Sequence, residues 1–204
     1  MADQDTLPPR LSPFEKLLND PSFAIAPASG SVAAVTLSAR LGLSSVQLDA
    51  RVGQADSLKQ AIQRALAVEL PASGGAVSQG RMRVLWHGRD RWMFLAPDAD
   101  NLFETLSRIT PDAGGVVVDQ SAGRAILRIE GARSRDVLAK GTGVDLHPRA
   151  FAEDHVALTS LFHVSATMDR RAGSTFDLHV ARGFAVSFLE SVREAAGEFG
   201  FDVA

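Results

Sequence analysis

Apolar and polar positions in the first half of the chain predict a strand followed by a helix. Residues 46–52 read VQLDARV, with an apolar side chain at every second position, as in a half-buried strand. Leu58, Ile62 and Leu66 then fall on one face of a helix. Asp56 stands where we expect an N-terminal capping residue for that helix.

The next segments predict a β-hairpin, a second helix and a further strand. Residues 81–86 and 91–96 are rich in apolar side chains and flank the short turn HGRD. Residues 100–109 carry apolar side chains at helical spacing, and the segment GGVVV at 114–118 predicts another strand. The predicted order of the first half is therefore β-α-β-β-α-β.

The second half repeats this order. A strand at 124–130 leads through Gly131 into a helix, which we expect to end at Gly141 with left-handed backbone geometry. Two more strands and a final helix are expected at 156–166, 174–181 and 184–199. We therefore predict an α+β fold of two related β-α-β-β-α-β halves with mainly antiparallel sheets.

The chain is divided into an arm and two halves that pack as one globular unit. Residues 1–30 form the arm, which holds five of the nine prolines. Residues 31–118 form the first α+β half, and residues 119–204 form the second. Because length alone allows one large or two small domains, this division depends on the repeated pattern.

The arm contains a short predicted helix in the segment SPFEKLLND, with Ser12 as its cap. Phe14, Leu17 and Leu18 give this helix a small apolar face. A helix of this length is not stable alone, so it must dock on another surface. That surface is either the chain's own domain or a partner protein.

The composition is that of an ordinary globular protein, with 46% hydrophobic and 22% charged residues among 204. A formal net charge of −3 argues against a general nucleic-acid-binding protein. The absence of cysteine excludes disulfides, thiolate metal sites and a cysteine nucleophile. We find neither a signal peptide nor an apolar run long enough to span a membrane, so we expect a cytoplasmic protein.

No motif for catalysis or cofactor binding stands out. The chain has no glycine-rich dinucleotide loop, no P-loop and no GxSxG motif. Its five histidines lack the spacing of metal ligands, and we expect His163 and His179 on polar faces of strands. Trp86 and Trp92 are expected in the hydrophobic core. We therefore predict no catalytic, cofactor-binding or metal-ligating residue.

One segment, 124–149, is basic in an otherwise acidic chain. It holds six Lys or Arg residues and three acidic residues, a net charge of +3. Arginine is enriched at protein interfaces and pairs with carboxylates, but a solvated helix face with pairs such as Arg133 and Asp136 explains the pattern equally well. The candidate partner-interface or anion-contacting residues are Arg124, Arg133, Arg135, Lys140, His147, Arg149, Phe14, Leu17 and Leu18.

The same region carries a family resemblance. The segments DQSAGRAILRIEGARSRDVLAKG at 119–141 and VDLHPRAF at 144–151 resemble the gamma subunit of heterotetrameric sarcosine oxidase. TFDLHVARGFAVSFLESV at 175–192 continues the resemblance in the same order. More distantly, these strand and helix segments are similar to the folate-binding fold of glycine-cleavage aminomethyltransferases.

The resemblance implies a role without cofactors for this chain. Such complexes oxidatively demethylate sarcosine to glycine, form hydrogen peroxide and pass the one-carbon unit to tetrahydrofolate, giving 5,10-methylenetetrahydrofolate. The resemblance places FAD, FMN, NAD and folate in the alpha and beta subunits and zinc in the delta subunit. It also implies that the gamma subunit is held chiefly by alpha.

We therefore predict an accessory, non-catalytic subunit whose partners are alpha, beta and delta subunits, and which binds neither nucleic acid nor membrane. An equivalent subunit of an N-methylglutamate-type dehydrogenase is an alternative of the same class. A free-standing folate-dependent aminomethyltransferase-like protein is an alternative of another class. The segment KGTG at 140–143 departs from the Lys-Gly-Cys motif of folate-dependent iron–sulfur assembly proteins, which disfavours that family.

Overall fold

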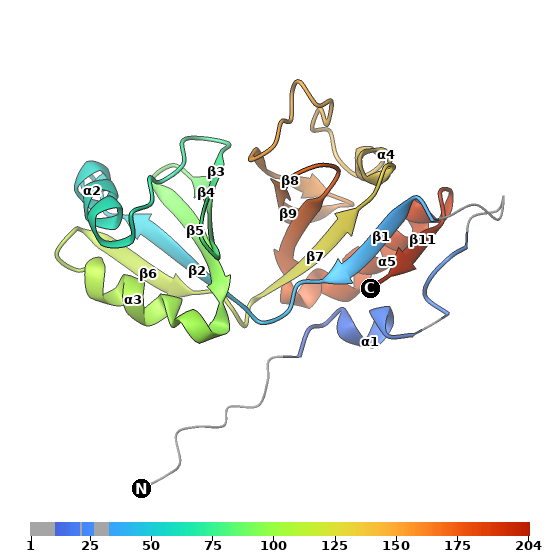
Figure 1. The fold of residues 1–204 in the computed structure, drawn as a ribbon, viewed down its shortest axis with the longest axis horizontal. Coiled ribbons are helices and arrows are strands. Elements are labelled where there is room, and N and C mark those ends of the chain that lie inside the picture. Colours follow the sequence, from blue (N-terminus) through green and yellow to red (C-terminus); the bar gives the residue numbers. More distant parts are fainter. Residues whose placement is uncertain (1–10, 21, 27–32) are drawn as a thin grey trace, which may run out of the picture.

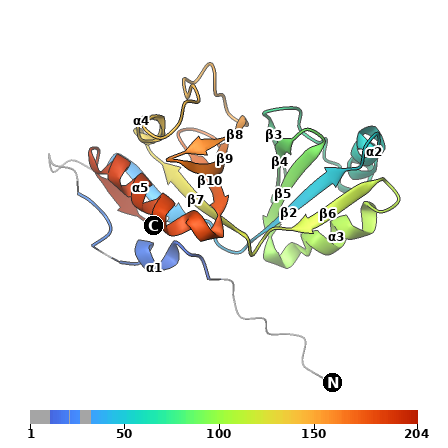
Figure 2. The ribbon, with the colours of Figure 1, turned by 180° about the vertical axis from the view of Figure 1, so that it is seen from behind.

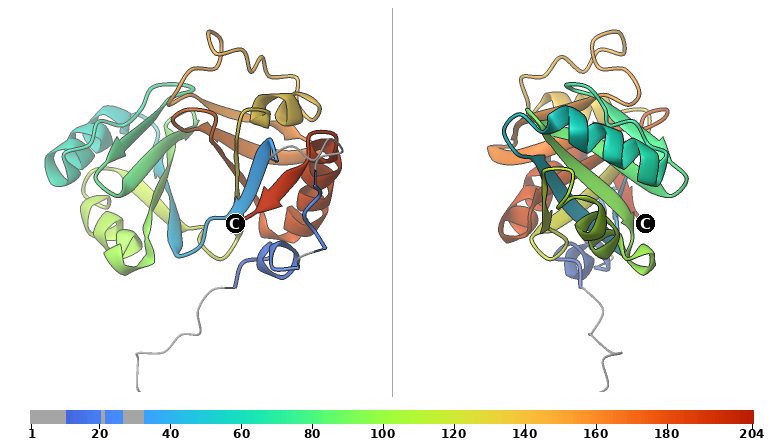
Figure 3. Two further views of the ribbon diagram at one scale, coloured as in Figure 1. Left: turned by 45° about the vertical axis from the view of Figure 1, so that its right-hand side comes forward. Right: turned by 90° about the vertical axis from the view of Figure 1, so that its left-hand side faces the viewer.

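Two β-sheets face each other at the centre of the molecule, and helices cover their outer faces (Figures 1 and 2). The computed structural model describes residues 11–20, 22–26 and 33–204. Further views show the helices on the outside of both sheets (Figure 3). The layers therefore run helix, sheet, sheet, helix, and a small apolar cluster that includes Leu85, Met93 and Ile126 lies between the sheets.

The first sheet is antiparallel throughout. Val46 and Leu48, two of the alternating apolar residues, are buried against Leu58 and Ile62 of the helix that follows. In spatial order its strands are β3 (Ala76–Gln79), β4 (Met82–Gly88), β5 (Arg91–Pro97), β2 (Leu43–Ala50) and β6 (Gly115–Asp119). Its helical segments are α2 (Ala55–Leu66), the 3₁₀ turn η1 (Asp98–Asp100) and α3 (Leu102–Ile109).

The second sheet has one parallel pair, and its other pairs are antiparallel. Leu127 and Ile129 are buried in one core with Phe188 and Val192 of the last helix. In spatial order its strands are β11 (Phe201–Val203), β1 (Val35–Ala39), β7 (Arg124–Glu130), β10 (Phe176–Ala181), β9 (Val164–Arg170) and β8 (Val156–Leu161). Its helical segments are α1 (Glu15–Leu18), α4 (Ser134–Ala139), the 3₁₀ turn η2 (Arg182–Phe184) and α5 (Ala185–Gly197).

The two halves repeat one element order. The series β2-α2-β3-β4-β5-α3-β6 has the same order as β7-α4-β8-β9-β10-α5-β11, which confirms the predicted α+β fold of two related halves. Strands β3 and β11 lie outside the ranges predicted for strands. In the second half, the single strand expected at 156–166 is the hairpin β8–β9. Its turn residues Phe162 and His163 have φ values of 49° and 65°, which glycine or asparagine usually adopts in such a turn. Because neither residue type is present here, the sequence gives no signal for the turn.

Strand β1 belongs to the second sheet, although the division at 31–118 placed it with the first half. It lies between β7 and β11 and brings Val35 and Leu37 into the core of the second sheet. Its neighbour Gly131 has a φ of +122°, and a Cβ there would lie 2.4 Å from the carbonyl oxygen of Ala34. Tertiary pairing therefore places this strand, and local pattern does not reveal it.

Helix α1 docks on the chain's own core. Phe14 and Leu18 are 0% and 6% exposed and belong to the core cluster of the second sheet, while Leu17 packs against it. Phe14 and Leu18 are thus buried within the chain instead of being presented to a partner. The Ser12 hydroxyl accepts a hydrogen bond from the Phe14 amide, but the helix itself begins only at Glu15. The rest of the predicted arm, at 1–10, 21 and 27–32, lies outside the described residues.

Several local predictions are wrong. Asp56 lies in the first turn of α2, whose N-cap is Gln54 without a side-chain hydrogen bond. Gly141 does not have the left-handed geometry expected of it. A glycine is needed there because a Cβ would lie 2.6 Å from the ring of Phe162. The last helix, expected at 184–199, begins at Ala185, and Phe184 lies in η2 and is 57% exposed.

Candidate functional site

The cations of helix α4 are engaged by the chain itself. Arg133 forms an ion pair with Asp136 at 3.0 Å, and its guanidinium lies 4.4 Å from the ring centre of Phe199. The ammonium of Lys140 donates to the carbonyl of Ala195 at 2.8 Å and to the carboxylate of Glu198 at 2.6 Å. These contacts support the solvated helix face, and they tie α4 to the C-terminal end of α5.

The loop from 141 to 155 separates the remaining cations. Arg135 donates to the carbonyl of Leu146, and its guanidinium lies 5.3 Å from the ring centre of Phe176. The loop between α4 and β8 extends away from both sheets (Figure 1). Its residues His147 and Arg149 are exposed, and Nδ1 of His147 accepts a hydrogen bond from the Arg149 amide. Arg135 therefore anchors the loop, and the loop presents His147 and Arg149 to solvent.

Arg124 lies apart from the α4 cations. It begins β7 on the face of the second sheet that looks toward the first sheet. Its side chain is half-buried and forms no ion pair with any residue in the described ranges. Burial lowers the pKa of its guanidinium. Proximity in sequence thus grouped residues that the fold separates.

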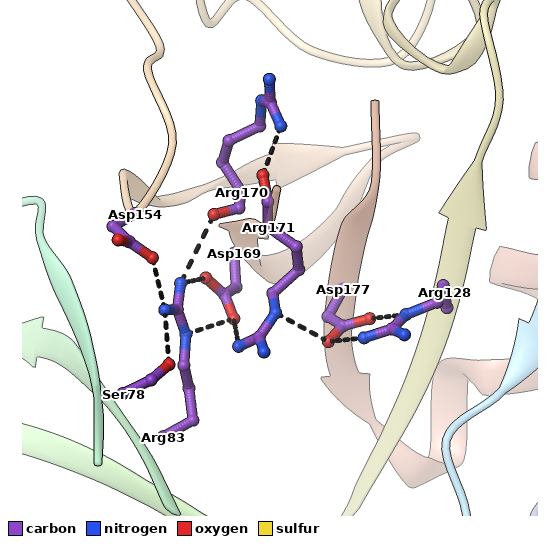
Figure 4. Close-up of polar contacts among 8 residues, drawn as sticks. All are labelled: Ser78, Arg83, Arg128, Asp154, Asp169, Arg170, Arg171 and Asp177. Carbon is purple, nitrogen blue, oxygen red and sulfur yellow. Dashed lines mark hydrogen bonds and ion pairs between the residues drawn. The ribbon is translucent and has the colours of Figure 1, made fainter. Parts of the chain in front are cut away.

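A buried ionic network joins the two sheets, and the sequence did not reveal it (Figure 4). Arg83 of β4 donates to both carboxylate oxygens of Asp169 of β9, at 3.2 and 2.6 Å. The Asp169 side chain is 0% exposed and that of Arg83 is 7% exposed. Arg83 also pairs with Asp154 and donates to the hydroxyl of Ser78 at 3.0 Å. A buried guanidinium is therefore fully surrounded by acceptors from both sheets.

The network continues across the second sheet. Arg171 contacts Asp169 at 3.4 Å and Asp177 at 3.9 Å (Figure 4). Arg128 binds Asp177 with two hydrogen bonds of 2.7 and 2.8 Å. Burial acts to raise the pKa of Asp177, but the hydrogen bonds and charge of Arg128 lower it overall. Asp177 therefore stays ionised, and the ion pairs of the network join neighbouring strands and the two sheets.

Two histidines occupy the same inner region. Nε2 of His87 lies 3.1 Å from the hydroxyl of Thr167. Burial, followed by the charges of Arg124 and His179, lowers the pKa of His87 to about 4. His179 lies on the polar face of β10 together with Asp177, as predicted, but this face is buried between the sheets: the residue is 4% exposed, and burial lowers its pKa as well. His163 lies in the β8–β9 turn instead of within a strand.

A broad groove of about 1070 Å³ lies beside α2 at the tip of the first sheet. Trp86 and Trp92 form a cross-strand pair in its wall. Trp92 is buried, as predicted, and its indole N–H donates to the carbonyl of Pro71 at 3.0 Å. Lys59 lies 5.9 Å from the Trp92 ring centre. The groove combines an aromatic wall with cations, but it has no pair of groups arranged for nucleophilic or acid–base chemistry.

Comparison with known proteins gives these features a context. Residues 51–198 match the family described as "Sarcosine oxidase, gamma subunit family". This chain belongs to that family. Its relatives in the sarcosine oxidase gamma-subunit family include the sarcosine oxidase subunit gamma of Corynebacterium sp. strain U-96, 30% identical over 155 residues that span 75% of this chain and 76% of the relative. The subunit gamma of an Arthrobacter species is 31% identical over 163 residues, 79% of this chain and 77% of its own length.

Solved structures agree with the family assignment. A chain of the heterotetrameric sarcosine oxidase from Corynebacterium sp. U-96, in complex with pyrrole 2-carboxylate, superposes with a TM-score of 0.80 and 28% identity. The match covers 93% of this chain and 96% of that one. Aminomethyltransferase T from Bartonella henselae gives a TM-score of 0.61 at 14% identity, over 84% of this chain and 48% of the other. That likeness shows a shared fold, as the resemblance implied.

The described residues lack two features, a candidate metal centre and a helix that could cross a membrane. They contain no group of three or more His, Asp or Glu side chains placed to bind a metal ion. In the same ranges, no helix is both long and apolar enough to cross a lipid bilayer. Much of the polar interior that the fold does contain is occupied by the paired charges of Arg83, Asp169, Arg128 and Asp177.

Proposed function

We propose that this chain is the accessory gamma subunit of a heterotetrameric sarcosine oxidase and carries no catalytic residue. The observation that carries the proposal is the match to a chain of such a heterotetramer, which spans 93% of this chain and 96% of that one. Identity of 30% to a named gamma subunit over most of both chains supports it. The assembled complex would demethylate sarcosine to glycine and form hydrogen peroxide and 5,10-methylenetetrahydrofolate.

The cofactors of the complex would lie outside this chain. FAD, FMN, NAD and tetrahydrofolate would belong to alpha and beta subunits and zinc to delta, with alpha the most direct partner. The donor groups in the described residues support this division. The start of helix α4, after Gly131, offers little for binding a cofactor phosphate. The helix is only six residues long, and the Ser134 hydroxyl at its start already donates to the Gly131 carbonyl. We also infer that the complex is cytoplasmic.

Co-expression with the genes beside its own tests the proposal. We expect the full chain expressed alone to be colourless, to oxidise no sarcosine and to show no saturable binding of tetrahydrofolate. Expressed with its neighbours, it should co-purify with larger flavin-containing subunits, and omitting it should lower the yield of the assembled oxidase. Flavin bound by the isolated chain, or failure to co-purify with any partner, would contradict the proposal.

A further inference from the structure

Arg124 differs from three arginines on the facing inner surfaces of the two sheets. Arg83, Arg128 and Arg171 lie in the same inner region, and each contacts at least one carboxylate. Arg124 is also partly withdrawn from water, yet no carboxylate in the described part of the chain pairs with it. A buried cation normally has a countercharge, because desolvation is otherwise uncompensated. Arg124 therefore lacks an anion that its surroundings call for.

Two more arginines line the same cavity. This cavity measures about 50 Å³ and lies where the chain crosses between the sheets, and Arg40 and Arg182 line it together with Arg124. Their backbones flank the start of β7, since the Arg40 amide donates to Ile126 and the Arg182 amide donates to Gly123, both at 2.9 Å. Neither side chain forms an ion pair within the described ranges. Both residues are exposed, although burial of part of the Arg40 side chain lowers its pKa.

The charges of the cavity favour a carboxylate. Among its described lining residues, Asp98 is the one acid, and it accepts a hydrogen bond from the Ser44 hydroxyl at 2.9 Å. The described lining residues thus include three arginines and one acid, which gives the cavity a positive excess. Guanidinium groups present forked donors that match the two oxygens of a carboxylate. The cavity, at about 50 Å³, has room for such a group.

Two exposed leucines line the cavity, which points to a protein as the source of the carboxylate. Leu11 and Leu41 line it and are 65% and 53% exposed. Apolar residues beside a desolvated arginine are typical of the centre of a protein interface. We propose that the cavity formed by Arg40, Arg124 and Arg182 receives a carboxylate of a partner subunit, with Leu11 and Leu41 covered by the same partner. This inference rests on the proposed function and adds a docking point to it.

Matched variants test the inference on the full chain. Arg124→Gln should leave the melting temperature of the isolated chain unchanged or raise it, because it removes an uncompensated charge. It should weaken assembly with the co-expressed subunits about tenfold or more, the effect of losing hydrogen bonds between charged groups. Arg51→Gln, an exposed arginine outside the cavity, should change neither quantity. Arg40→Gln should weaken assembly in the same direction.

Each other result counts against the inference. A lower melting temperature with normal assembly would make Arg124 a structural residue. Stabilisation of the isolated chain by millimolar acetate or phosphate, with assembly unaffected by Arg124→Gln, would show a site for free anions only. If wild type and Arg124→Gln assemble equally, the inference alone fails. If the wild-type chain assembles with no partner, the proposed function fails and the inference fails with it.

Discussion

Burial keeps the two inner-face histidines neutral, whereas Arg83, Arg128 and Arg171 in the same region are paired with carboxylates. His87 has one hydrogen-bond partner, Thr167, and cations at Arg124 and Arg91 oppose its protonation. Asp49 favours protonation, but burial and the cations outweigh it. The same surroundings that stabilise ion pairs therefore make a proton on His87 unfavourable.

Stability should therefore fall in mild acid. An unfolded His87 takes up a proton below about pH 6.5, whereas the folded one does so only near its pKa of about 4. Between these pH values protons bind preferentially to the unfolded state. The part of the free energy of unfolding that comes from neutral His87 is therefore fully present above about pH 6.5 and is lost as the pH falls toward 4. This loss is about 3 kcal/mol at most. Melting curves should show this slope for wild type and a shallower one for His87→Gln. His163→Asn, in an exposed turn, should keep the wild-type slope.

At the scale of elements, the sequence predicts the helices and strands whose apolar spacing is contained in a short stretch of residues. The alternation in β2 and the helical spacing in α2 follow from burial of one face, and both were found. The β8–β9 turn was missed because Phe162 and His163 adopt left-handed geometry without a residue that favours it. Short strands such as β1 and β11 depend on pairing with distant residues, and a local pattern does not contain that information.

Helix α1 shows how an element with little intrinsic stability is held. It has four residues, so it persists only through docking, and Phe14 is fully buried beneath the second sheet. Phe14→Ala should lower the free energy of unfolding by about 3 to 5 kcal/mol, as for other buried aromatic residues. Leu11→Ala, which removes an exposed side chain, should change it by less than about 0.5 kcal/mol. Urea denaturation of the full chain measures both. A loss below about 1 kcal/mol for Phe14→Ala would contradict this docking.

At the scale of the whole molecule, the polar site depends on contacts that no sequence window contains. Arg83 and Asp169 are 86 residues apart, and they meet because the two halves pack sheet against sheet. The cations of segment 124–149 are close in sequence, but most of them pair with acidic side chains or backbone carbonyls of the chain itself. A charged residue among apolar ones, such as Asp177 in TFDLHV, was the signal that could have located the network.

The Arg83–Asp169 pair should be the main polar contribution to joining the halves. Asp169→Ala should destabilise the chain by about 3 to 5 kcal/mol, because Arg83 would stay buried with only part of its countercharge. Asp136→Ala removes the exposed pair with Arg133 and should cost less than about 1 kcal/mol. The double variant Arg83→Met/Asp169→Leu should recover part of the loss, since apolar residues can replace a buried pair. Arg83→Met and Asp169→Leu are also measured singly. If the loss of stability in the double variant equals the sum of these two single losses, the residues are not coupled, and the apolar cluster alone would hold the sheets together.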